Sequence, residues 1–421
     1  MRKKQKDVYS TKFVIVVFVR FLFTMFSWYY GIRRILPKEV KRLKSPYLVL
    51  GNHVGFFDPF VVGNLLPKLT HFVASDASFK TPAFGFFLRG LGTIPTKKNI
   101  RDTKAIRDII SVIKQGDNVG IFPEAVRTWS GTSFPIDPSI AKLIKHLKVP
   151  VIVPILKGMN LFNPRWSVKT RRTLVEVEYT LLVSAEEIAS LSADAIYEKL
   201  CMVLRHDEVD YQRDKMNRIR SKHKAEYISH VLYVCPECHS VDSFSCEGND
   251  FKCRSCGYDI HIDSYSFFSR PNGGNLHFDN IRDWYNWEEK WMHKRVTEQL
   301  QEDTGHLFFT DSKSLVYQLP ENGNAKLIGE ADISLYGDKI IVHFYDETED
   351  LVWNFEDLQT INPQVYERLE VFYDNKAFRI IGGTKGVSAL KWEVAVNSIW
   401  KKLGYDNKLS PYIIQKEKDA L

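Results

Sequence analysis

Residues 51–58 read GNHVGFFD, and they follow a short apolar run at residues 47–50. An apolar run of this length that ends at a glycine predicts a buried strand leading into a loop. Asp58 and Pro59 then begin a helix that we expect to extend to Leu66, with Asp58 as its N-cap and Pro59 as its first residue. His53 in the loop and Asp58 at the helix start can therefore lie side by side.

The rest of the first half alternates strands with helices. We expect strands at 119–122, 151–156 and 173–183, with Pro154 breaking the strand at 151–156. We expect helices at 99–114 and 139–147, and a helical stretch from a capping box at Ser184 to about Arg205. Strands that alternate with helices predict an α/β domain with a largely parallel sheet.

The N-terminus is basic and apolar. The 421-residue chain has a net charge of +7, and its first 42 residues hold eleven Lys and Arg against two acidic residues. Residues 13–30 are almost wholly apolar, but Arg20, Thr24, Ser27 and Gly31 recur at helical spacing. A helix lying in the membrane interface fits this narrow polar stripe, and a true span or a buried core helix stays open. No signal-peptide cleavage pattern follows, because Arg33 and Arg34 stand there.

A second polar cluster lies at residues 122–127, which read FPEAVR. His53 can remove a proton from a hydroxyl, and a carboxylate such as that of Asp58 holds an imidazole in the correct tautomer. Glu124 and Arg127 form a polar clamp suited to an anionic substrate. The loop at 51–58 has no cysteine or serine nucleophile, so direct attack by the substrate hydroxyl is the simpler mechanism. As an alternative, Asp58 before Pro59 serves only as a helix cap.

Together these motifs resemble the glycerolipid acyltransferases, over roughly residues 35–205. The second block of that family appears at 92–98 as GTIPTKK, with Lys98 where the family has arginine. The third block is usually FPEGTR, and Ala125 and Val126 replace its glycine and threonine. The fourth block matches the sequence VIVP at 151–154.

The resemblance implies a membrane-associated O-acyltransferase on the cytoplasmic face. His53 would act as general base oriented by Asp58. Lys98, Glu124 and Arg127 would hold the phosphate or glycerol of a lysophosphatidate-like acceptor, and Pro154 would line the acyl side. The donor would be an acyl thioester of coenzyme A or of acyl carrier protein. The departures at the second and third blocks leave another hydroxyl or amine lipid acceptor open, and a non-catalytic lipid-surface adaptor is a second hypothesis.

Four of the six cysteines form two C-x-x-C pairs, at Cys235, Cys238, Cys253 and Cys256. This spacing in a reducing compartment predicts a zinc ribbon with a closed, structural site of four thiolates. A rubredoxin-type iron site is the alternative. Cys201, Cys246 and His239 are not expected as ligands. Lys252 and Arg254 are too few to favour nucleic acid, so a protein partner is the more natural use of the ribbon.

The remaining C-terminal sequence predicts a helix at 278–300, short strands at 307–309, 340–344, 369–373 and 377–381, and a final helix at 387–403. This order resembles a pleckstrin-homology (PH) or GRAM-type domain. We therefore divide the chain into a membrane-associating segment (1–42), an acyltransferase domain (43–205), a charged linker (206–230), a zinc ribbon (231–265), and a helix with a β-rich α+β domain (278–421).

Overall fold

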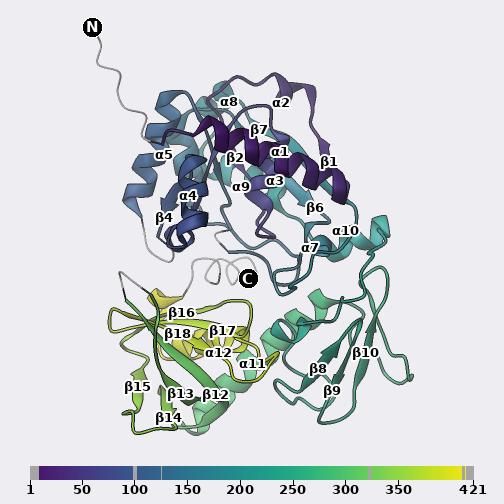
Figure 1. The fold of residues 1–421 in the computed structure, drawn as a ribbon, viewed down its shortest axis with the longest axis vertical. Coiled ribbons are helices and arrows are strands. Elements are labelled where there is room, and N and C mark those ends of the chain that lie inside the picture. Colours follow the sequence, from purple (N-terminus) through teal and green to yellow (C-terminus); the bar gives the residue numbers. More distant parts are fainter. Residues whose placement is uncertain (1–8, 98–101, 125, 321–323, 410–412, 414–421) are drawn as a thin grey trace. The chain divides into compact units, whose positions relative to one another are not determined.

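The computed structural model describes residues 9–97, 102–124, 126–320, 324–409 and 413. The chain divides into two compact units (Figure 1). The N-terminal unit contains the residues up to Arg165 together with 171–219, and the C-terminal unit contains 166–170 and 220–410.

A largely parallel sheet forms the centre of the N-terminal unit, as the sequence predicts. All neighbours are parallel except β6 and β7. The strand order is β1-β7-β6-β2-β5-β3-β4. The strands are β1 (Ile32–Ile35), β2 (Leu48–Leu50), β3 (Thr70–Ser75), β4 (Ile94–Thr96), β5 (Asn118–Ile121), β6 (Val151–Lys157) and β7 (Val175–Val183).

Pro154 does not break its strand, so that prediction is wrong. Strand β6 continues through Pro154, which lies opposite Tyr179 of β7. The pairing of β6 with β2 already ends at Ile152, so β6 has a strand partner on one side only at the proline. Proline is tolerated where a strand needs no ladder donor on one side.

Helices cover both faces of this sheet. Leu48 and Leu50 belong to a core shared with α5, α6 and α9, whereas Val49 belongs to the core with α1 and α3, because successive strand residues point to opposite faces. The helices are α1 (Phe13–Tyr30), α2 (Lys38–Arg42), α3 (Asp58–Leu65), α4 (Pro82–Gly90), α5 (Thr103–Gln115), α6 (Ser139–Leu147), α7 (Met159–Phe162), α8 (Ala185–Ser190), α9 (Ala193–Leu204) and α10 (Glu208–Lys215).

The capping box at Ser184 is present, but the helical stretch behind it is divided. Ser184 caps α8 together with Glu187, and Ser192 then caps a second helix, α9, through the N–H of Ala195. A second N-cap residue inside a periodic pattern is a signal for a new helix start. The segment expected as a charged linker contains α10, which Asp207 caps, and residues up to Ile219 belong to the N-terminal unit.

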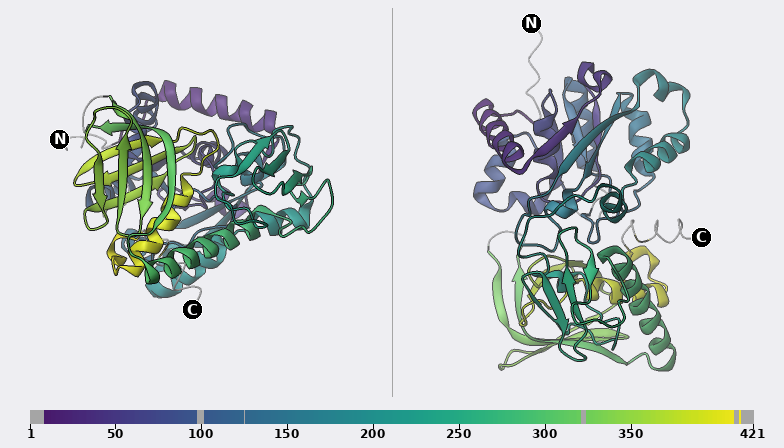
Figure 2. Two further views of the ribbon diagram at one scale, coloured as in Figure 1. Left: turned by 90° about the horizontal axis from the view of Figure 1, so that it is seen from below. Right: turned by 90° about the vertical axis from the view of Figure 1, so that its right-hand side faces the viewer.

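Helix α1 lies along the outside of the N-terminal unit and packs against α3 and α4 (Figure 2). Its polar stripe faces the protein: Arg20 donates from Nη2 to the carbonyl oxygen of Leu66 (3.4 Å), and Asn64 donates to the hydroxyl of Thr24 (3.3 Å). Since the last carbonyls of a helix have no partner within it, Arg20 serves the end of α3. By length and composition alone, α1 is also long and apolar enough to cross a membrane.

The C-terminal unit begins with a four-stranded sheet in the order β11-β10-β9-β8, followed by a long helix. A seven-stranded antiparallel sheet in the order β15-β14-β13-β12-β18-β17-β16 comes next, and a final helix follows it. The elements are β8 (Phe244–Glu247), β9 (Asp250–Cys253), β10 (Asp259–Ile262), β11 (Phe268–Ser269), α11 (Ile281–Glu302), β12 (Leu307–Leu319), β13 (Lys326–Tyr336), β14 (Lys339–Phe344), β15 (Leu351–Asn354), β16 (Leu358–Pro363), β17 (Arg368–Tyr373), β18 (Lys376–Ile381) and α12 (Leu390–Lys402).

The expected β-rich region and closing helix are therefore present, but several strands were not predicted. β13, β15 and β16 were missed, as was most of β12. Polar residues and irregular register between Asp311 and Ser314 interrupt the alternation of β12 with its partner. A bulge of this kind hides the period-2 pattern on which strand prediction depends.

A buried ion cluster joins the small sheet to the large one within this unit. Lys391 of α12 is fully buried and pairs with Asp242, which follows the first cysteine pair, and with Asp311 of β12. Trp392 donates from its indole to Asp311 (2.7 Å). Breaking a buried pair on one side leaves an uncompensated charge, so the cluster ties the position of the cysteine loop to the large sheet.

Candidate active site

His53 and Asp58 lie in hydrogen-bond contact at the carboxyl end of β2. Nδ1 of His53 is 2.8 Å from Oδ2 of Asp58. Asp58 is fully buried, whereas the His53 side chain is 22% exposed. Because an ionised carboxylate only accepts hydrogen bonds, Nδ1 carries the proton and Nε2 is the basic nitrogen.

Asp58 is the first residue of α3 and not its N-cap, so that prediction is displaced by one residue. Its Oδ2 atom turns back into the preceding loop and accepts the backbone N–H groups of Val54 (2.6 Å) and Gly55 (2.9 Å) as well as the His53 ring. The carboxylate therefore shapes the loop that carries the histidine. Of the two roles that the sequence allowed for Asp58, contact with the histidine is the one the geometry shows.

Glu124 binds the backbone of two loops. It is 2% exposed, and its Oε1 accepts the N–H of His53 (3.3 Å) while Oε2 accepts the N–H of Phe134 (3.2 Å). Burial raises the pKa of Glu124 from its ordinary 4.5 to about 8; the two N–H donors act in the opposite direction, and the charge of Asp58 raises the pKa further. Both carboxyl oxygens thus serve the protein backbone.

Two further contacts hold the His53 loop against the Glu124 loop. The carbonyl oxygen of His53 accepts the N–H of Thr128 (3.1 Å). The imidazole ring stacks on Phe122 with a centroid distance of 4.6 Å and an interplanar angle of 20°. β2 and β5 are parallel neighbours, so the loops at their carboxyl ends must emerge at the same edge of the sheet.

Behind the histidine, Asn52 and Gly51 attach the loop to β6. The amide of Asn52 accepts the N–H of Leu156 (2.8 Å) and donates to its carbonyl (3.4 Å). A side chain on Gly51 would come within 3.2 Å of Pro154 Cγ. Pro154 is buried against the base of this loop.

The expected acceptor-binding residues are only partly placed. Arg127 is partly exposed on the Glu124 loop, and its carbonyl oxygen accepts from Arg165 Nη1 (2.9 Å). Lys98 and Ala125 lie outside the described residues. Lys97 follows β4, and its N–H donates to Asp102 (3.0 Å).

Sequence reasoning missed residues that support this loop from a distance. The Arg165 guanidinium lies 3.7 Å from the ring centroid of Trp129 while it holds the carbonyl of Arg127. Glu208 is 2% exposed and accepts the N–H groups of Gly158 (2.7 Å) and Asn160 (3.1 Å). These residues carry no motif spacing, and only their burial in the fold identifies them.

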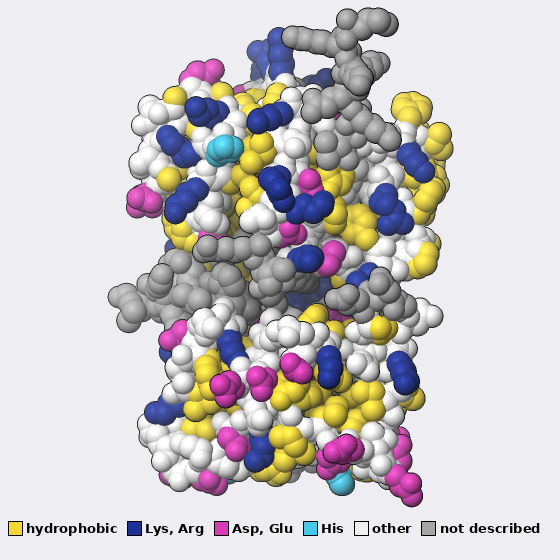
Figure 3. All heavy atoms as spheres, turned by 90° about the vertical axis from the view of Figure 1, so that its left-hand side faces the viewer, with side chains coloured by type: hydrophobic (Ala, Val, Ile, Leu, Met, Phe, Trp, Pro, Cys, Tyr) yellow, Lys and Arg dark blue, Asp and Glu magenta, His cyan; other side chains and the backbone are white. Residues whose placement is uncertain are grey.

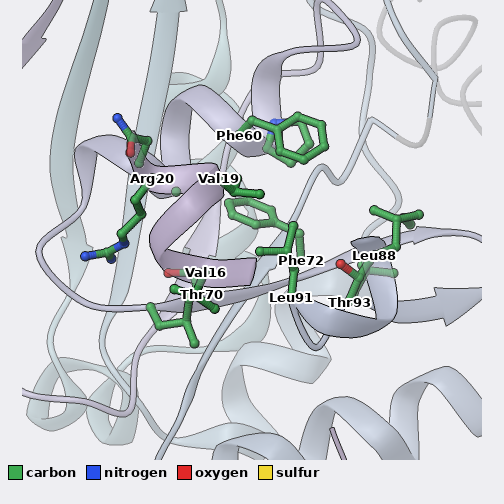
Figure 4. A pocket seen from close by; sticks show the side chains of 15 residues that line it. Val16, Val19, Arg20, Phe60, Thr70, Phe72, Leu88, Leu91 and Thr93 are labelled. Carbon is green, nitrogen blue, oxygen red and sulfur yellow. The ribbon is translucent and has the colours of Figure 1, made fainter. Parts of the chain in front are cut away.

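An apolar pocket lies between α1, α3, β3 and α4, with an empty volume of about 650 Å³ that includes its opening to solvent (Figure 4). Phe60 of α3 and Phe72 of β3 are among its lining residues. Phe72 stacks on Phe122 at 5.8 Å, and Phe122 stacks on His53. Two rings therefore connect the pocket to the histidine.

In the C-terminal unit, the four predicted cysteines lie together. Their sulfur atoms are all within 4.8 Å of one another. The pairs Cys235–Cys256 and Cys238–Cys253 are separated by 3.7 Å and 3.8 Å. Four thiolates about 2.3 Å from a tetrahedral zinc ion are about 3.8 Å apart, so the donor set fits a metal of this kind.

Residues 32–156 match the family model described as Acyltransferase. The 1-acyl-sn-glycerol-3-phosphate acyltransferase of Bacillus subtilis is 23% identical over 165 residues, which are 38% of this chain and 82% of that protein. The crystal structure of the 1-acyl-sn-glycerophosphate (LPA) acyltransferase PlsC from Thermotoga maritima is 18% identical, covers 48% of this chain and 80% of that chain, and has a TM-score of 0.40.

A structure titled Vps36 N-terminal PH domain covers 24% of this chain and 82% of that chain, with 16% identity and a TM-score of 0.19.

The N-terminal unit thus contains an acyltransferase domain, and the protein is an acyltransferase. It is similar to the 1-acylglycerol-3-phosphate O-acyltransferases, and glycerolipid acyl transfer is the general activity that this similarity supports.

Substitution of Glu124 distinguishes a positioning role from substrate contact. Glu124→Ala removes the carboxyl that accepts the partly buried N–H groups of His53 and Phe134, at up to roughly 1–3 kcal/mol each. We expect kcat for acyl transfer to fall at least tenfold with little change in KM, because the His53 loop is displaced. A large rise in KM for the acceptor at unchanged kcat would instead assign the carboxylate to the substrate. Glu198→Gln, on the exposed face of α9, is the matched control.

The pH dependence of stability provides a second readout for the same residue. The folded state keeps Glu124 protonated up to about pH 8, whereas the unfolded chain ionises it near 4.5. The folded state therefore binds more protons within this window, and its free energy of unfolding falls as pH rises from about 4.5 to about 8. Chemical denaturation at several pH values should show this slope reduced in Glu124→Gln. Parallel curves for the two proteins would contradict the raised pKa.

Proposed function

We propose that the protein transfers a fatty acyl group from an acyl thioester to the hydroxyl of a lysophosphatidate-like glycerolipid, with His53 as general base. The observation that carries this proposal is the His53–Asp58 contact at the carboxyl end of β2, inside the segment that matches the acyltransferase family. Active sites of open α/β sheets are built at the carboxyl ends of parallel strands.

In the proposed mechanism the acceptor hydroxyl approaches Nε2 of His53. As its oxygen forms a bond to the thioester carbonyl carbon, its proton passes to Nε2, and the carbon–sulfur bond then breaks. The imidazolium returns the proton to the departing thiolate, so the histidine ends as it began. Asp58 keeps Nδ1 protonated and stabilises the transient positive charge.

The residues around the histidine divide this task. We assign Arg127, together with Lys98 of the second block, to the phosphate of the acceptor, because guanidinium and ammonium groups pair with phosphate oxygens. Glu124 accepts the backbone N–H of His53, and Arg165 donates to the backbone carbonyl of Arg127. Both residues therefore position the loops that carry these side chains. The apolar pocket at Phe60 and Phe72 is the place for the acyl chain.

We also propose that α1 attaches the protein to a membrane without crossing it. The face of α1 away from the protein is apolar and exposed, as Phe13 (81%) and Trp28 (79%) show. Phe86 and Phe87 of α4 and Phe56 beside the histidine extend this surface. A helix whose polar stripe is engaged by α3 would have to leave those partners to span a bilayer.

Basic side chains accompany this apolar surface. Lys12 lies 4.5 Å from the ring centroid of Phe86, and Arg172 lies 5.5 Å from that of Tyr29. Figure 3, which views the N-terminal unit from the side, shows Lys and Arg side chains distributed between apolar ones on its surface. Cations among apolar groups suit an anionic lipid surface, which would present the lysolipid to the site. A cytoplasmic face agrees with the reducing environment that free thiols require.

For the four cysteines we propose a structural zinc ion. Cys235 and Cys253 are buried and Cys238 and Cys256 are exposed. Four thiolates complete the tetrahedral shell of a zinc ion, which is the pattern of a structural site. When bound, the ion would cross-link the two C-x-x-C loops. Glu288, fully buried on α11, accepts the N–H groups of Tyr233 and Val234 and so directs the chain into the first loop.

His53→Ala should abolish acyl transfer while the fold survives. Loss of the general base costs roughly 10²–10⁴-fold in rate. The assay supplies labelled acyl-CoA and acyl carrier protein thioesters with lysophosphatidate, other lysolipids and amine lipids as acceptors, and thermal unfolding checks the fold. His146→Ala, on the exposed part of α6, is the control. Full activity of the purified His53 variant would overturn the mechanism. Preference for another acceptor would overturn only the assigned substrate.

Membrane attachment should depend on the exposed face of α1. Phe21 is 64% exposed, so Phe21→Glu removes little core packing but places a charge in the interface. We expect binding to vesicles of phosphatidylcholine and phosphatidylserine to weaken by about 10- to 100-fold, the value of one large buried apolar side chain. Met202→Glu on α9, where the methionine is 71% exposed, should bind as the wild type does. Equal loss in both variants would contradict the assignment.

Metal analysis of the purified protein should find one zinc ion per chain. Chelation should lower the unfolding temperature and the near-ultraviolet dichroism of the C-terminal tryptophans, because the loop that holds Asp242 then loses its anchor. Cys253→Ser should lose the ion, whereas Cys201→Ser on α9 should keep it. Iron in place of zinc, or a thermally unchanged apoprotein, would refute this part of the proposal.

A further inference from the structure

The pocket beneath α1 changes character along its length. Phe60 and Phe72 form the wall nearest the histidine, and Thr93 lies on the side of Phe72 (Figure 4). Arg20 and Thr70 lie on the opposite side (Figure 4), and Asn64 also lines the pocket. The positions along α3 and β3 explain this separation. Phe60 lies in the first turn of α3, close to Asp58, whereas Asn64 lies near the end of that helix. Thr70 is the first residue of β3.

Thr70 is the unusual residue at that end. It is 6% exposed, and among the residues that the structure describes its Oγ1 atom has no hydrogen-bond partner. A buried hydroxyl without a partner costs roughly 1–3 kcal/mol. An apolar chain that filled the pocket would leave this cost in place.

Each neighbouring polar group already makes one hydrogen bond. Arg20 donates to the carbonyl of Leu66, and Asn64 donates to Thr24. They make the far end polar, and Thr70 adds a buried hydroxyl that makes no hydrogen bond among the described residues. A methyl terminus would therefore be a poorer match for this end than a terminus that carries a hydroxyl.

We propose that the far end of the pocket recognises a hydroxyl group on the acyl chain, so that the enzyme prefers acyl donors hydroxylated near the chain terminus. Thr70 is the specificity-determining residue. This inference rests on the proposed acyl transfer and adds the class of acyl chain. The pocket length then selects the chain whose hydroxyl reaches Thr70.

The test compares acyl-CoA donors in pairs of equal chain length, one with a terminal hydroxyl and one without, from short to long chains. For the wild type, the ratio of kcat/KM for the hydroxylated donor to that for the plain donor should pass through a maximum at one chain length. One hydrogen bond is worth about 2- to 10-fold in that ratio. Thr70→Val should abolish the maximum, and Thr70→Ser should restore it.

Thr180→Val, on β7 and away from the pocket lining, is the matched control and should leave the ratios unchanged. A ratio at or below one at every chain length, or a maximum that survives Thr70→Val, would overturn the inference. Efficient transfer of the plain acyl chains would still support the acyltransferase function in that case. Absence of transfer from every donor would instead overturn the proposed function, and the inference with it. Should Thr70→Val not fold, Thr70→Ala replaces it with the same expectations.

Discussion

The active-site region depends on one buried carboxyl group, that of Glu124, which holds the backbone of two loops at once. One oxygen accepts the N–H of His53, and the other accepts the N–H of Phe134. Backbone N–H groups removed from water need acceptors, and the Glu124 carboxyl supplies them for both loops. The stacking of His53 on Phe122 follows from the same arrangement.

Asp58 also binds backbone N–H groups, but those of a single loop. Its Oδ2 atom accepts two backbone N–H groups of the His53 loop and the imidazole itself. A single carboxylate thus shapes the loop and sets the tautomer. In both cases an acidic residue acts through the backbone. Gly51 contributes separately, because a Cβ there would come within 3.2 Å of Phe122 and Pro154.

Arg20 of helix α1 has one meaning in the sequence pattern and another in the folded structure. Within the sequence, Arg20 is an obstacle to a membrane span and part of a polar stripe. In the fold it contacts the last turn of α3, and the stripe is turned toward the protein while the apolar face stays exposed. Arg34 serves the same helix end by donating to Leu65 (2.7 Å). Helix, stripe and exposed face were predictable, but not the surface that the stripe would meet.

The sequence by itself determined the α/β order of the first half, the ends of α1 and α6, the grouping of the four cysteines, and the proximity of His53 to Asp58. These follow from local chemistry: hydrophobic period, helix caps and short-range spacing. Only the tertiary structure decided that Glu124 faces the backbone, that Pro154 lies within a continuous strand, that Arg165 and Glu208 support the site, and that Thr70 stands unpaired at the end of a pocket. Each of these depends on which strands become neighbours, and strand pairing is set by long-range burial that no local pattern encodes.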